Sequence, residues 1–162
     1  MKKETALFAA GCFWGVEELI RKVEGVLDTQ VGYCGGSLDD PKYVQVKTGT
    51  TGHAEAVKVI FDSEKLSYEN LLRLFFKLHD PTTLNRQGND IGTQYRSAIF
   101  YLSPEQKISA EKIKREVDDS GKWSKPVMTT VEPEARFYDA EDYHQDYLQK
   151  EPDGYTCHYW RE

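Results

Sequence analysis

Apolar and polar residues alternate in two short segments of the chain, which is the period-two pattern of half-buried strands. Strands are therefore predicted over residues 27–33 and 53–62, and further strands are expected over residues 4–10, 93–102 and 127–131. Between them, apolar residues recur at the 3.6-residue period of an amphipathic helix. Together with capping residues, this spacing predicts helices over residues 13–23, 67–78, 103–120 and 140–150, and a helical turn near residues 43–47.

Turn and capping residues set the limits of these elements. Ser67 and Ser103 are predicted N-cap residues, and Pro104 at the first helical position strengthens the second of these helix starts. Glycines follow the second strand at residues 35 and 36, where they break the pleat. Two polar connections, residues 34–52 and 80–92, are long for a compact domain, and long loops of this kind are often functional.

The elements up to residue 102 follow the order strand, helix, strand, strand, helix, strand. This is the split β-α-β pattern, so we expect an α/β fold of the α+β kind, with a two-layer, ferredoxin-like core and helices on one face of the sheet. Added helices and long loops would decorate that core. We expect a single catalytic domain over residues 1–150 and a C-terminal tail over residues 151–162, where Pro152 and Gly154 oppose regular structure.

Composition narrows the class of partner. The 162 residues include 21 Lys and Arg against 27 Asp and Glu, a formal net charge of −6. Nucleic acids and anionic membrane surfaces require clustered basic charge, so neither is expected as a partner. No apolar run is long enough for a transmembrane helix, and the short run at residues 6–10 does not make a signal peptide. We expect a cytoplasmic protein and leave open whether a leader has been removed.

The three cysteines are Cys12, Cys34 and Cys157, with no C-x-x-C spacing. Zinc ribbons and thioredoxin-type motifs are therefore disfavoured, and an odd number argues against a structural disulfide framework. The four histidines do not stand at the spacing of metal ligands, so no metal is expected and a structural role is favoured for each. The thiols are then either buried spectators or reactive groups.

Cys12 is the strongest candidate for chemistry, because it lies between the first predicted strand and the first predicted helix. A thiol at a helix N-terminus faces unpaired N–H groups and the positive end of the helix dipole, and both favour the nucleophilic thiolate. The alternative is a small apolar residue that closes a strand. We favour the nucleophile, since Cys12 lies at a turn and outside any apolar stripe. Phe13 and Trp14 are adjacent on the helix, so they are not both expected to be buried against the same layer.

Glu55 shares one face of its predicted strand with Val57, Val59 and Phe61. If the carboxyl group is buried there, burial raises its pKa and makes it a usable general acid near neutral pH. A position at the exposed end of the strand is an equally good interpretation of the pattern.

Three residues of the long loops are further candidates. Tyr43 lies in the first loop, and Asp90 and Tyr95 flank the end of the second. A phenol donates a hydrogen bond to a polar oxygen without a change of charge, although each residue alone is more often a surface or packing residue. The acidic run at residues 139–146 is interpreted as a solvated helix face, with Tyr143 and Tyr147 packed inward.

Six segments, taken together, are more specific for one protein family than any single residue considered so far. They are residues 11–15 (Gly-Cys-Phe-Trp-Gly), 52–55 (Gly-His-Ala-Glu), 79–83 (His-Asp-Pro-Thr-Thr), 86–97 (Arg-Gln-Gly-Asn-Asp-Ile-Gly-Thr-Gln-Tyr-Arg-Ser), 140–147 (Ala-Glu-Asp-Tyr-His-Gln-Asp-Tyr) and 154–158 (Gly-Tyr-Thr-Cys-His). In combination and order they resemble the peptide methionine sulfoxide reductase A family. The resemblance covers nearly the whole chain, and the first and fourth segments are the most specific.

The resemblance implies an enzyme that reduces the S epimer of methionine sulfoxide, free or in proteins, to methionine. By position, Cys12 matches the nucleophile that attacks the sulfoxide sulfur, and Glu55 matches the acid that protonates the sulfoxide oxygen. Phe13 and Trp14 match a pocket for the methyl group of the substrate. No metal or organic cofactor is implied.

The same resemblance gives roles to the loop residues. Tyr43 and Tyr95 match hydroxyls that hold the sulfoxide oxygen, and Asp90 matches a carboxylate that organises the polar side of the site. An apolar pocket for a methyl group and a polar cage for an oxygen would together distinguish the two configurations at sulfur.

Members of that family differ most in how they regenerate the thiol of the nucleophile after each turnover. The sulfenic acid formed on Cys12 would condense with a second thiol to a disulfide, which thioredoxin usually reduces. Cys157 matches a recycling cysteine of many members, and the more C-terminal cysteine that many members also have is not present in this sequence. Cys34 matches no usual recycling position, so it is either a harmless thiol or an alternative resolving residue or relay.

Other classes of protein also use a single reactive thiol. A cysteine hydrolase would pair Cys12 with a histidine base, and a peroxidase-type thiol enzyme would consume peroxide and have little use for the aromatic pair. A pure binding module is a more distant alternative. Reduction of a chiral sulfoxide, followed for both epimers, separates these classes.

Overall fold

A six-stranded sheet forms the centre of the computed structural model, which describes residues 1–161; Glu162 lies outside the described part. The strand order is β7-β6-β1-β3-β2-β8. Neighbouring strands are antiparallel except for β6 and β7, which are parallel. The strands are β1 (Lys3–Ala10), β2 (Val26–Cys34), β3 (Ala54–Asp62), β6 (Ser97–Tyr101), β7 (Thr130–Pro133) and β8 (Tyr138–Asp139).

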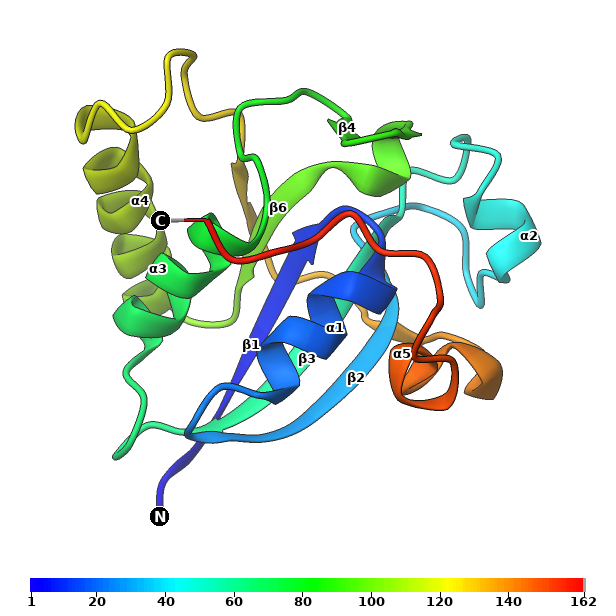
Figure 1. Ribbon diagram of the computed structural model, residues 1–162, viewed down its shortest axis with the longest axis horizontal. Helices are drawn as coiled ribbons and strands as arrows, with labels where there is room; N and C mark the ends of the chain where they lie inside the picture. The colour runs from blue at the N-terminus through cyan, green and yellow to red at the C-terminus, as the bar shows by residue number, and fades with distance from the viewer. Residues whose placement is uncertain (162) are drawn as a thin grey trace.

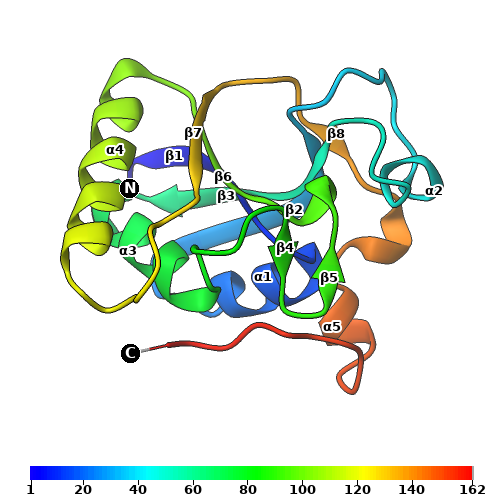
Figure 2. The same cartoon turned by 90° about the horizontal axis from the view of Figure 1, so that it is seen from above.

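The four inner strands confirm the predicted split β-α-β core. Helix α1 (Phe13–Arg21) connects β1 to β2, and helix α3 (Tyr68–Leu78) connects β3 to β6. Each connection leaves room for one strand of the other unit, which produces the ferredoxin-like order β6-β1-β3-β2. Both helices lie on the same face of the sheet (Figure 2). Strands β7 and β8 extend the sheet at its two edges.

The predicted helix caps are present. Ser67 accepts a hydrogen bond from the N–H of Asn70 at 3.1 Å, and Ser103 accepts one from the N–H of Gln106 at 3.2 Å. Ser103 and Pro104 start helix α4 (Pro104–Asp119), which packs beside α3 (Figure 1). The helical turn near residues 43–47 is also confirmed, as α2 (Tyr43–Val46).

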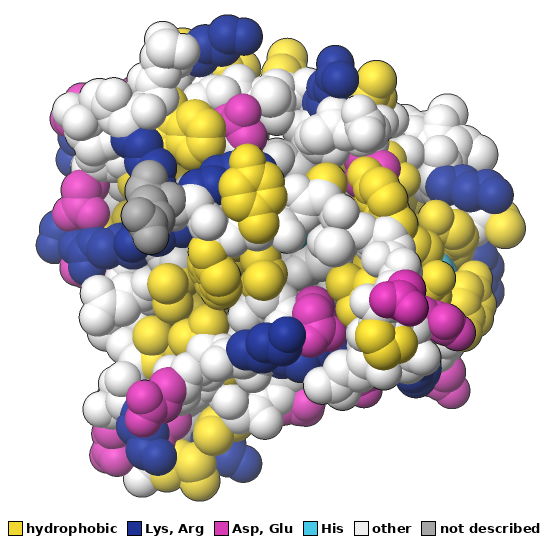
Figure 3. Space-filling model, in the orientation of Figure 1, with side chains coloured by type: hydrophobic (Ala, Val, Ile, Leu, Met, Phe, Trp, Pro, Cys, Tyr) yellow, Lys and Arg dark blue, Asp and Glu magenta, His cyan; other side chains and the backbone are white. Residues whose placement is uncertain are grey.

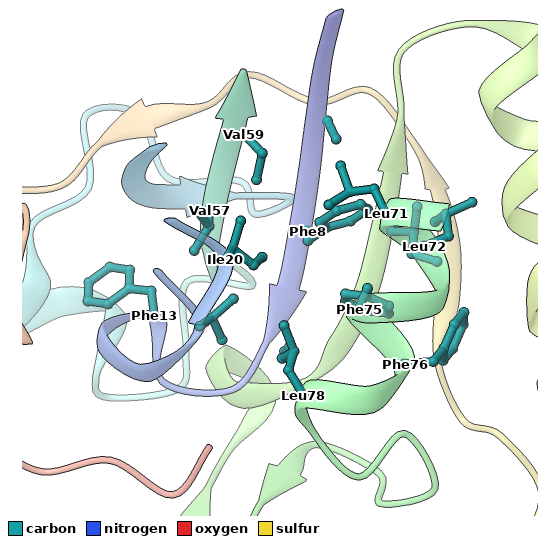
Figure 4. Close-up of a cluster of buried hydrophobic side chains, with 14 of the residues drawn as sticks. Phe8, Phe13, Ile20, Val57, Val59, Leu71, Leu72, Phe75, Phe76 and Leu78 are labelled. Carbon is teal, nitrogen blue, oxygen red and sulfur yellow. The ribbon is translucent and has the colours of Figure 1, made fainter. Parts of the chain in front are cut away.

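The main core fills the space between the sheet and α1, α3 and α4. In Figure 4, Phe8 on β1 lies between side chains of α1 and side chains of α3. Phe8 and Phe75 are in ring contact, with centroids 4.9 Å apart. The other face of the sheet is lined by smaller residues and is covered by the segment between β7 and β8, through Ala135 and Phe137. From Ala6 to Ala10, the central strand β1 is therefore buried on both faces.

Two predicted strands have different limits in the structure. The segment expected as a strand from residue 93 begins as a 3₁₀ turn, η1 (Thr93–Tyr95), and only then becomes β6. The strand expected at 127–131 is β7 and starts at Thr130. The second long polar loop, residues 80–92, contains a two-stranded hairpin of β4 (Arg86–Gln87) and β5 (Asp90–Ile91). Short hydrogen-bonded elements such as these have no period long enough to be read from sequence.

The prediction of one helix over residues 140–150 is wrong. The segment forms a 3₁₀ turn, η2 (Asp142–His144), and a short helix, α5 (Tyr147–Lys150), separated by Asp146 in a left-handed conformation with φ of 55°. The side-chain amide of Gln145 pairs with both backbone groups of Val31 at the edge of β2, each at 2.9 Å. This long-range pairing holds Gln145 out of a helix. Among the described residues, no helix is long and apolar enough to cross a membrane.

Candidate active site

Cys12 lies in the turn that joins β1 to α1. Gly11 makes this turn with a φ of +93°, which favours glycine, and a Cβ added to it would lie 2.7 Å from the Cβ of Gln87. Cys12 itself directly precedes the first residue of the helix, as predicted, and only 7% of it is exposed. The turn therefore packs Gly11, the residue before Cys12, against the loop that contains Gln87.

Burial raises the pKa of the Cys12 thiol well above its usual range, and the carboxylate of Glu55 raises it further. The backbone hydrogen bond from Trp14 at the helix start lowers the pKa, which is the predicted effect, but burial outweighs it. The helix start thus acts in the expected direction, but burial is the larger effect in the resting protein. At neutral pH the resting group is a thiol.

Glu55 lies on β3, on the face that the helices cover, and 2% of it is exposed. Its Oε1 accepts a hydrogen bond from the N–H of Phe13 at 3.2 Å, which links the carboxyl group to the residue after Cys12. Burial raises the pKa of Glu55 to about 8, although the bond from Phe13 lowers it. Of the two interpretations left open by the sequence, the buried one is correct. The carboxyl group is protonated at neutral pH and can donate that proton.

Aromatic rings surround the start of α1. Phe13 is buried, and its ring centroid lies 5.8 Å from that of Tyr33. Trp14 is only partly buried, and its indole N–H donates to Nδ1 of His144 at 3.0 Å. The indole also stacks on Tyr147, with centroids 3.9 Å apart. The expectation that Phe13 and Trp14 are not both fully buried is confirmed. Both rings contact His144, with centroids 5.2 Å and 5.7 Å from its ring.

Two phenols approach the Cys12–Glu55 pair. Tyr43 begins α2 and Tyr95 ends η1, and both are half-buried. Burial raises the pKa of both hydroxyls, to about 12 for Tyr43, and the next cause in each case is the charge of Glu55. Both hydroxyls are therefore protonated donors close to Glu55 at neutral pH.

Tyr43 is held in place by Glu141. One carboxylate oxygen of Glu141 accepts a hydrogen bond from the backbone N–H of Tyr43 at 3.0 Å, and the other accepts one from the hydroxyl of Tyr33 at 2.9 Å. Glu141 belongs to the acidic run at residues 139–146, which was expected to be solvated, but its side chain is half-buried. Tyr143 of the same run is 57% exposed, so the prediction that it packs inward is wrong.

The C-terminal tail brings Cys157 to the same site. Residues 151–161 contain no helix or strand, yet the tail runs across α1 and the end of β1 (Figure 1). The hydroxyl of Tyr155 donates to Oδ2 of Asp90 at 3.2 Å, and Sγ of Cys157 lies 3.9 Å from the same oxygen. Asp90 and Cys157 both raise the pKa of Cys12, which requires that they lie near it. The tail is therefore packed against the site and is not the loose segment that Pro152 and Gly154 suggested.

Cys34 lies elsewhere. It follows Tyr33 on β2, so its side chain points to the opposite face of the sheet, where it belongs to the smaller apolar cluster. It is fully buried, and Sγ lies 3.6 Å from the carbonyl oxygen of Ala135. Burial raises the pKa of Cys34 to about 11. All three cysteines are free thiols.

The family model for peptide methionine sulfoxide reductase matches residues 4–162. The chain belongs to the peptide methionine sulfoxide reductase family. A relative from Methanothermobacter thermautotrophicus, named peptide methionine sulfoxide reductase MsrA, is 54% identical over 149 residues, which are 92% of this chain and 88% of the relative.

Two solved structures of a yeast member are also similar to this chain. The reduced form of Mxr1 from Saccharomyces cerevisiae aligns with a TM-score of 0.94 and 40% identity, over 99% of this chain and 93% of that one. Mxr1 in complex with Trx2 aligns with a TM-score of 0.69 and 29% identity, over 99% and 91% of the two chains. The fold of this reductase family is therefore the fold of this chain.

Several residues that contact the site were given no functional role from the sequence. All of them lie within the segments that resemble the reductase family, which is the signal that could have found them. Their contacts are long-range, so neither local period nor spacing indicates them. They are Gln87, Glu141, His144, Tyr147 and His158.

Proposed function

We propose that this protein reduces the S epimer of methionine sulfoxide, free or in proteins, to methionine. The observation that supports this most directly is the buried carboxyl group of Glu55 beside the Cys12 turn, protonated at neutral pH. A sulfoxide oxygen is a poor leaving group until it is protonated, so the reaction needs an acid next to a sulfur nucleophile. Membership of the reductase family agrees with this chemistry.

In the reductase step, the sulfur of Cys12 attacks the sulfoxide sulfur and forms an S–S bond with it, while Glu55 gives its proton to the sulfoxide oxygen. The substrate S–O bond breaks as the hydroxyl group passes to the sulfur of Cys12, and the S–S bond breaks as methionine leaves. The thiol proton of Cys12 returns the carboxyl group to its protonated form. Cys12 is oxidised by two electrons to a sulfenic acid, and the substrate sulfur is reduced by two.

The neighbouring side chains would bind the substrate in one configuration. Phe13 and Trp14 offer an apolar surface to the methyl group, and the hydroxyls of Tyr43 and Tyr95 donate to the oxygen. Asp90 organises the polar side together with the tail. A site with its apolar and polar sides fixed in this way accepts one sulfoxide epimer and rejects the other, because exchanging methyl and oxygen leaves both mismatched.

Recycling would use Cys157 and thioredoxin. Cys157 attacks the sulfenic acid to form a disulfide with Cys12, and a dithiol protein reduces that disulfide. The tail exposes Tyr155 and Trp160, and Figure 3 shows hydrophobic side chains gathered on the face along which the tail runs. The yeast protein Mxr1 has been crystallised with Trx2. Residues 1–150 would be the catalytic domain and 151–162 the recycling tail, and the cytoplasm is the expected location.

A thiol hydrolase fits the site less well. Such an enzyme requires a histidine base with a nitrogen directed at the nucleophile, whereas Nε2 of His158 bonds to the carbonyl oxygen of Ala10 and its Nδ1 faces Cys157. A peroxidase-type enzyme has no use for Trp14 held between His144 and Tyr147.

The proposal is tested with the separated epimers of a methionine sulfoxide and dithiothreitol as reductant. We expect the wild-type chain to form methionine from the S epimer alone and Cys12→Ser to form none. Cys34→Ser removes a different buried thiol and is the matched control. Equal turnover of both epimers, or turnover by Cys12→Ser, would contradict the proposal.

A further inference from the structure

His158 joins the tail to the strand that ends at the nucleophile. It is 6% exposed, and its Nε2 lies 2.6 Å from the carbonyl oxygen of Ala10, the last residue of β1. A carbonyl oxygen only accepts hydrogen bonds, so Nε2 holds the hydrogen and donates it. Burial lowers the pKa of His158 to about 4, so the ring is neutral at pH 7 and Nδ1 is unprotonated.

The other nitrogen of this ring faces the recycling thiol. Nδ1 of His158 lies 3.9 Å from Sγ of Cys157. The imidazole therefore stands between the end of β1, two residues before Cys12, and the thiol of Cys157. A single buried ring links the two cysteine-bearing segments, although they are far apart in the sequence.

The surface of α1 is shaped to receive this part of the tail. A Cβ added to Gly15 would overlap Oγ1 of Thr156 and Nδ1 of His158. Oγ1 of Thr156 in turn accepts a hydrogen bond from the N–H of His158 at 3.1 Å. The absence of a side chain at Gly15 thus provides the space in which the imidazole lies, which is an observation independent of the bond to Ala10.

We infer that His158 is a positioning residue for recycling: its hydrogen bond to Ala10 holds Cys157 beside Cys12, so that the sulfenic acid is captured quickly as a disulfide. The inference rests on the proposed function. In the step concerned, the Cys12–Cys157 S–S bond forms, the S–O bond of the sulfenic acid breaks, and the thiol proton of Cys157 leaves with the hydroxyl group as water. The sulfur of Cys157 is oxidised and that of Cys12 is reduced.

A fixed position matters because this step competes with others. Two groups held in reacting geometry behave as if at a very high local concentration. A sulfenic acid that is not captured remains open to further oxidation or to an added trapping reagent. Loss of the anchor should therefore slow disulfide formation and leave the release of methionine unchanged.

The test uses the full chain, reduced, mixed with excess S sulfoxide and no reductant, and quenched with acid at successive times. Methionine measures the reductase step, and mass spectrometry measures the Cys12–Cys157 disulfide and the sulfenic acid trapped by dimedone. We expect His158→Ala to release its first methionine at the wild-type rate but to form the disulfide at least about tenfold more slowly, the effect of one lost buried hydrogen bond. His158→Gln retains an N–H that can reach Ala10, and it should remain within roughly threefold of wild type.

Tyr159→Ala, at an exposed neighbour on the same tail, is the matched control and should behave as wild type. If His158→Ala does not fold by circular dichroism, the comparison of His158→Gln with wild type decides. Disulfide formation in His158→Ala at the wild-type rate, or equal slowing of the first methionine, would overturn the inference. A folded His158→Gln that forms the Cys12–Cys157 disulfide at least tenfold more slowly than wild type would also overturn the inference. A wild-type chain that releases no methionine overturns the proposed function itself, which distinguishes the two failures.

Discussion

Burial of Glu55 keeps its carboxyl group protonated for chemistry, but it also lowers the stability of the fold at pH values where the unfolded chain would ionise this group. The carboxyl group is buried on a strand face shared with Val57, Val59 and Phe61. Its only hydrogen bond to a described residue is from the N–H of Phe13. The raised pKa, about 8, keeps the proton available for a substrate. It also means that ionising the group in the folded state is unfavourable.

We expect Glu55→Gln to slow the reductase step by roughly 10²–10⁴-fold, because the amide retains the shape but cannot transfer a proton. The pH dependence of the remaining activity should weaken for the same reason. Single-turnover release of methionine between pH 5 and 9 measures both. A rate equal to wild type would remove Glu55 from the role of acid.

The same substitution should increase stability, and the increase should depend on pH. Below the usual pKa of 4.5, the Glu55 carboxyl is protonated in both the folded and the unfolded chain, so it does not make the free energy of unfolding depend on pH. Between 4.5 and about 8 the unfolded chain loses the proton and the folded chain retains it, so wild-type stability falls as pH rises, by up to about 1.4 kcal/mol per unit. Gln has no such loss.

The measurement is urea unfolding of both proteins at several pH values. The difference in free energy of unfolding between Glu55→Gln and wild type should grow in favour of Glu55→Gln from pH 5 to pH 8. Above pH 8 the difference should be constant. A difference that does not change with pH would show that the folded-state carboxyl titrates normally.

At the scale of elements, α1 contacts two segments that lie far from it and from each other in the sequence. Its first turn contacts Glu55 of β3, and its outer surface receives the tail at Gly15. The helix itself is predicted well from the spacing of Phe13, Val16 and Ile20, all of which are buried. The contact between α1 and the tail cannot be predicted in this way, because the residues around Gly15 do not show what packs against it.

Gly15→Ala separates these two properties of α1. Alanine favours a helix by about 1 kcal/mol over glycine, but the added methyl group must displace Thr156 and His158. We expect the first methionine to form at the wild-type rate and thioredoxin-driven turnover to fall several-fold. Lys22→Ala, at the exposed end of the same helix, should retain both rates. Unchanged thioredoxin turnover in Gly15→Ala would show that the seat of the tail is not required for recycling.

Local patterns predicted the elements better than they predicted what covers them. The alternation around Val57 and Val59 defined β3 and the face of Glu55, but its burial depends on α1, more than 40 residues earlier in the chain. The break between η2 and α5 depends on Gln145 pairing with Val31, 114 residues away. The proposed roles at the site came from the resemblance to the reductase family, because period and spacing do not show long-range contacts. Cys12, Glu55 and Tyr95 lie in the segments that carry the resemblance, whereas Tyr43 lies outside all six.

At the scale of the molecule, the sheet separates its cysteines. Cys12 and Cys157 lie on the helix side, and Cys34 lies beneath the β7–β8 connection on the other. We expect Cys34→Ser to retain thioredoxin-dependent turnover and Cys157→Ser to stop after one methionine per chain, because a thiol on the far face cannot reach the sulfenic acid. Turnover that survives in Cys157→Ser and is lost in Cys34→Ser would reverse this assignment.

The direction of β1 has a practical consequence for handling the protein. The strand starts at Lys3, and its eight residues rise about 3.3 Å each, so roughly 26 Å separate its start from the turn that bears the nucleophile (Figure 1). The amino group of Met1 lies at the start of the strand, 3.1 Å from Glu64. A linker attached there would bind the molecule to a bead or an electrode with the end that carries Cys12 and Cys157 facing the solution, open to bulky oxidised proteins and to the reductant.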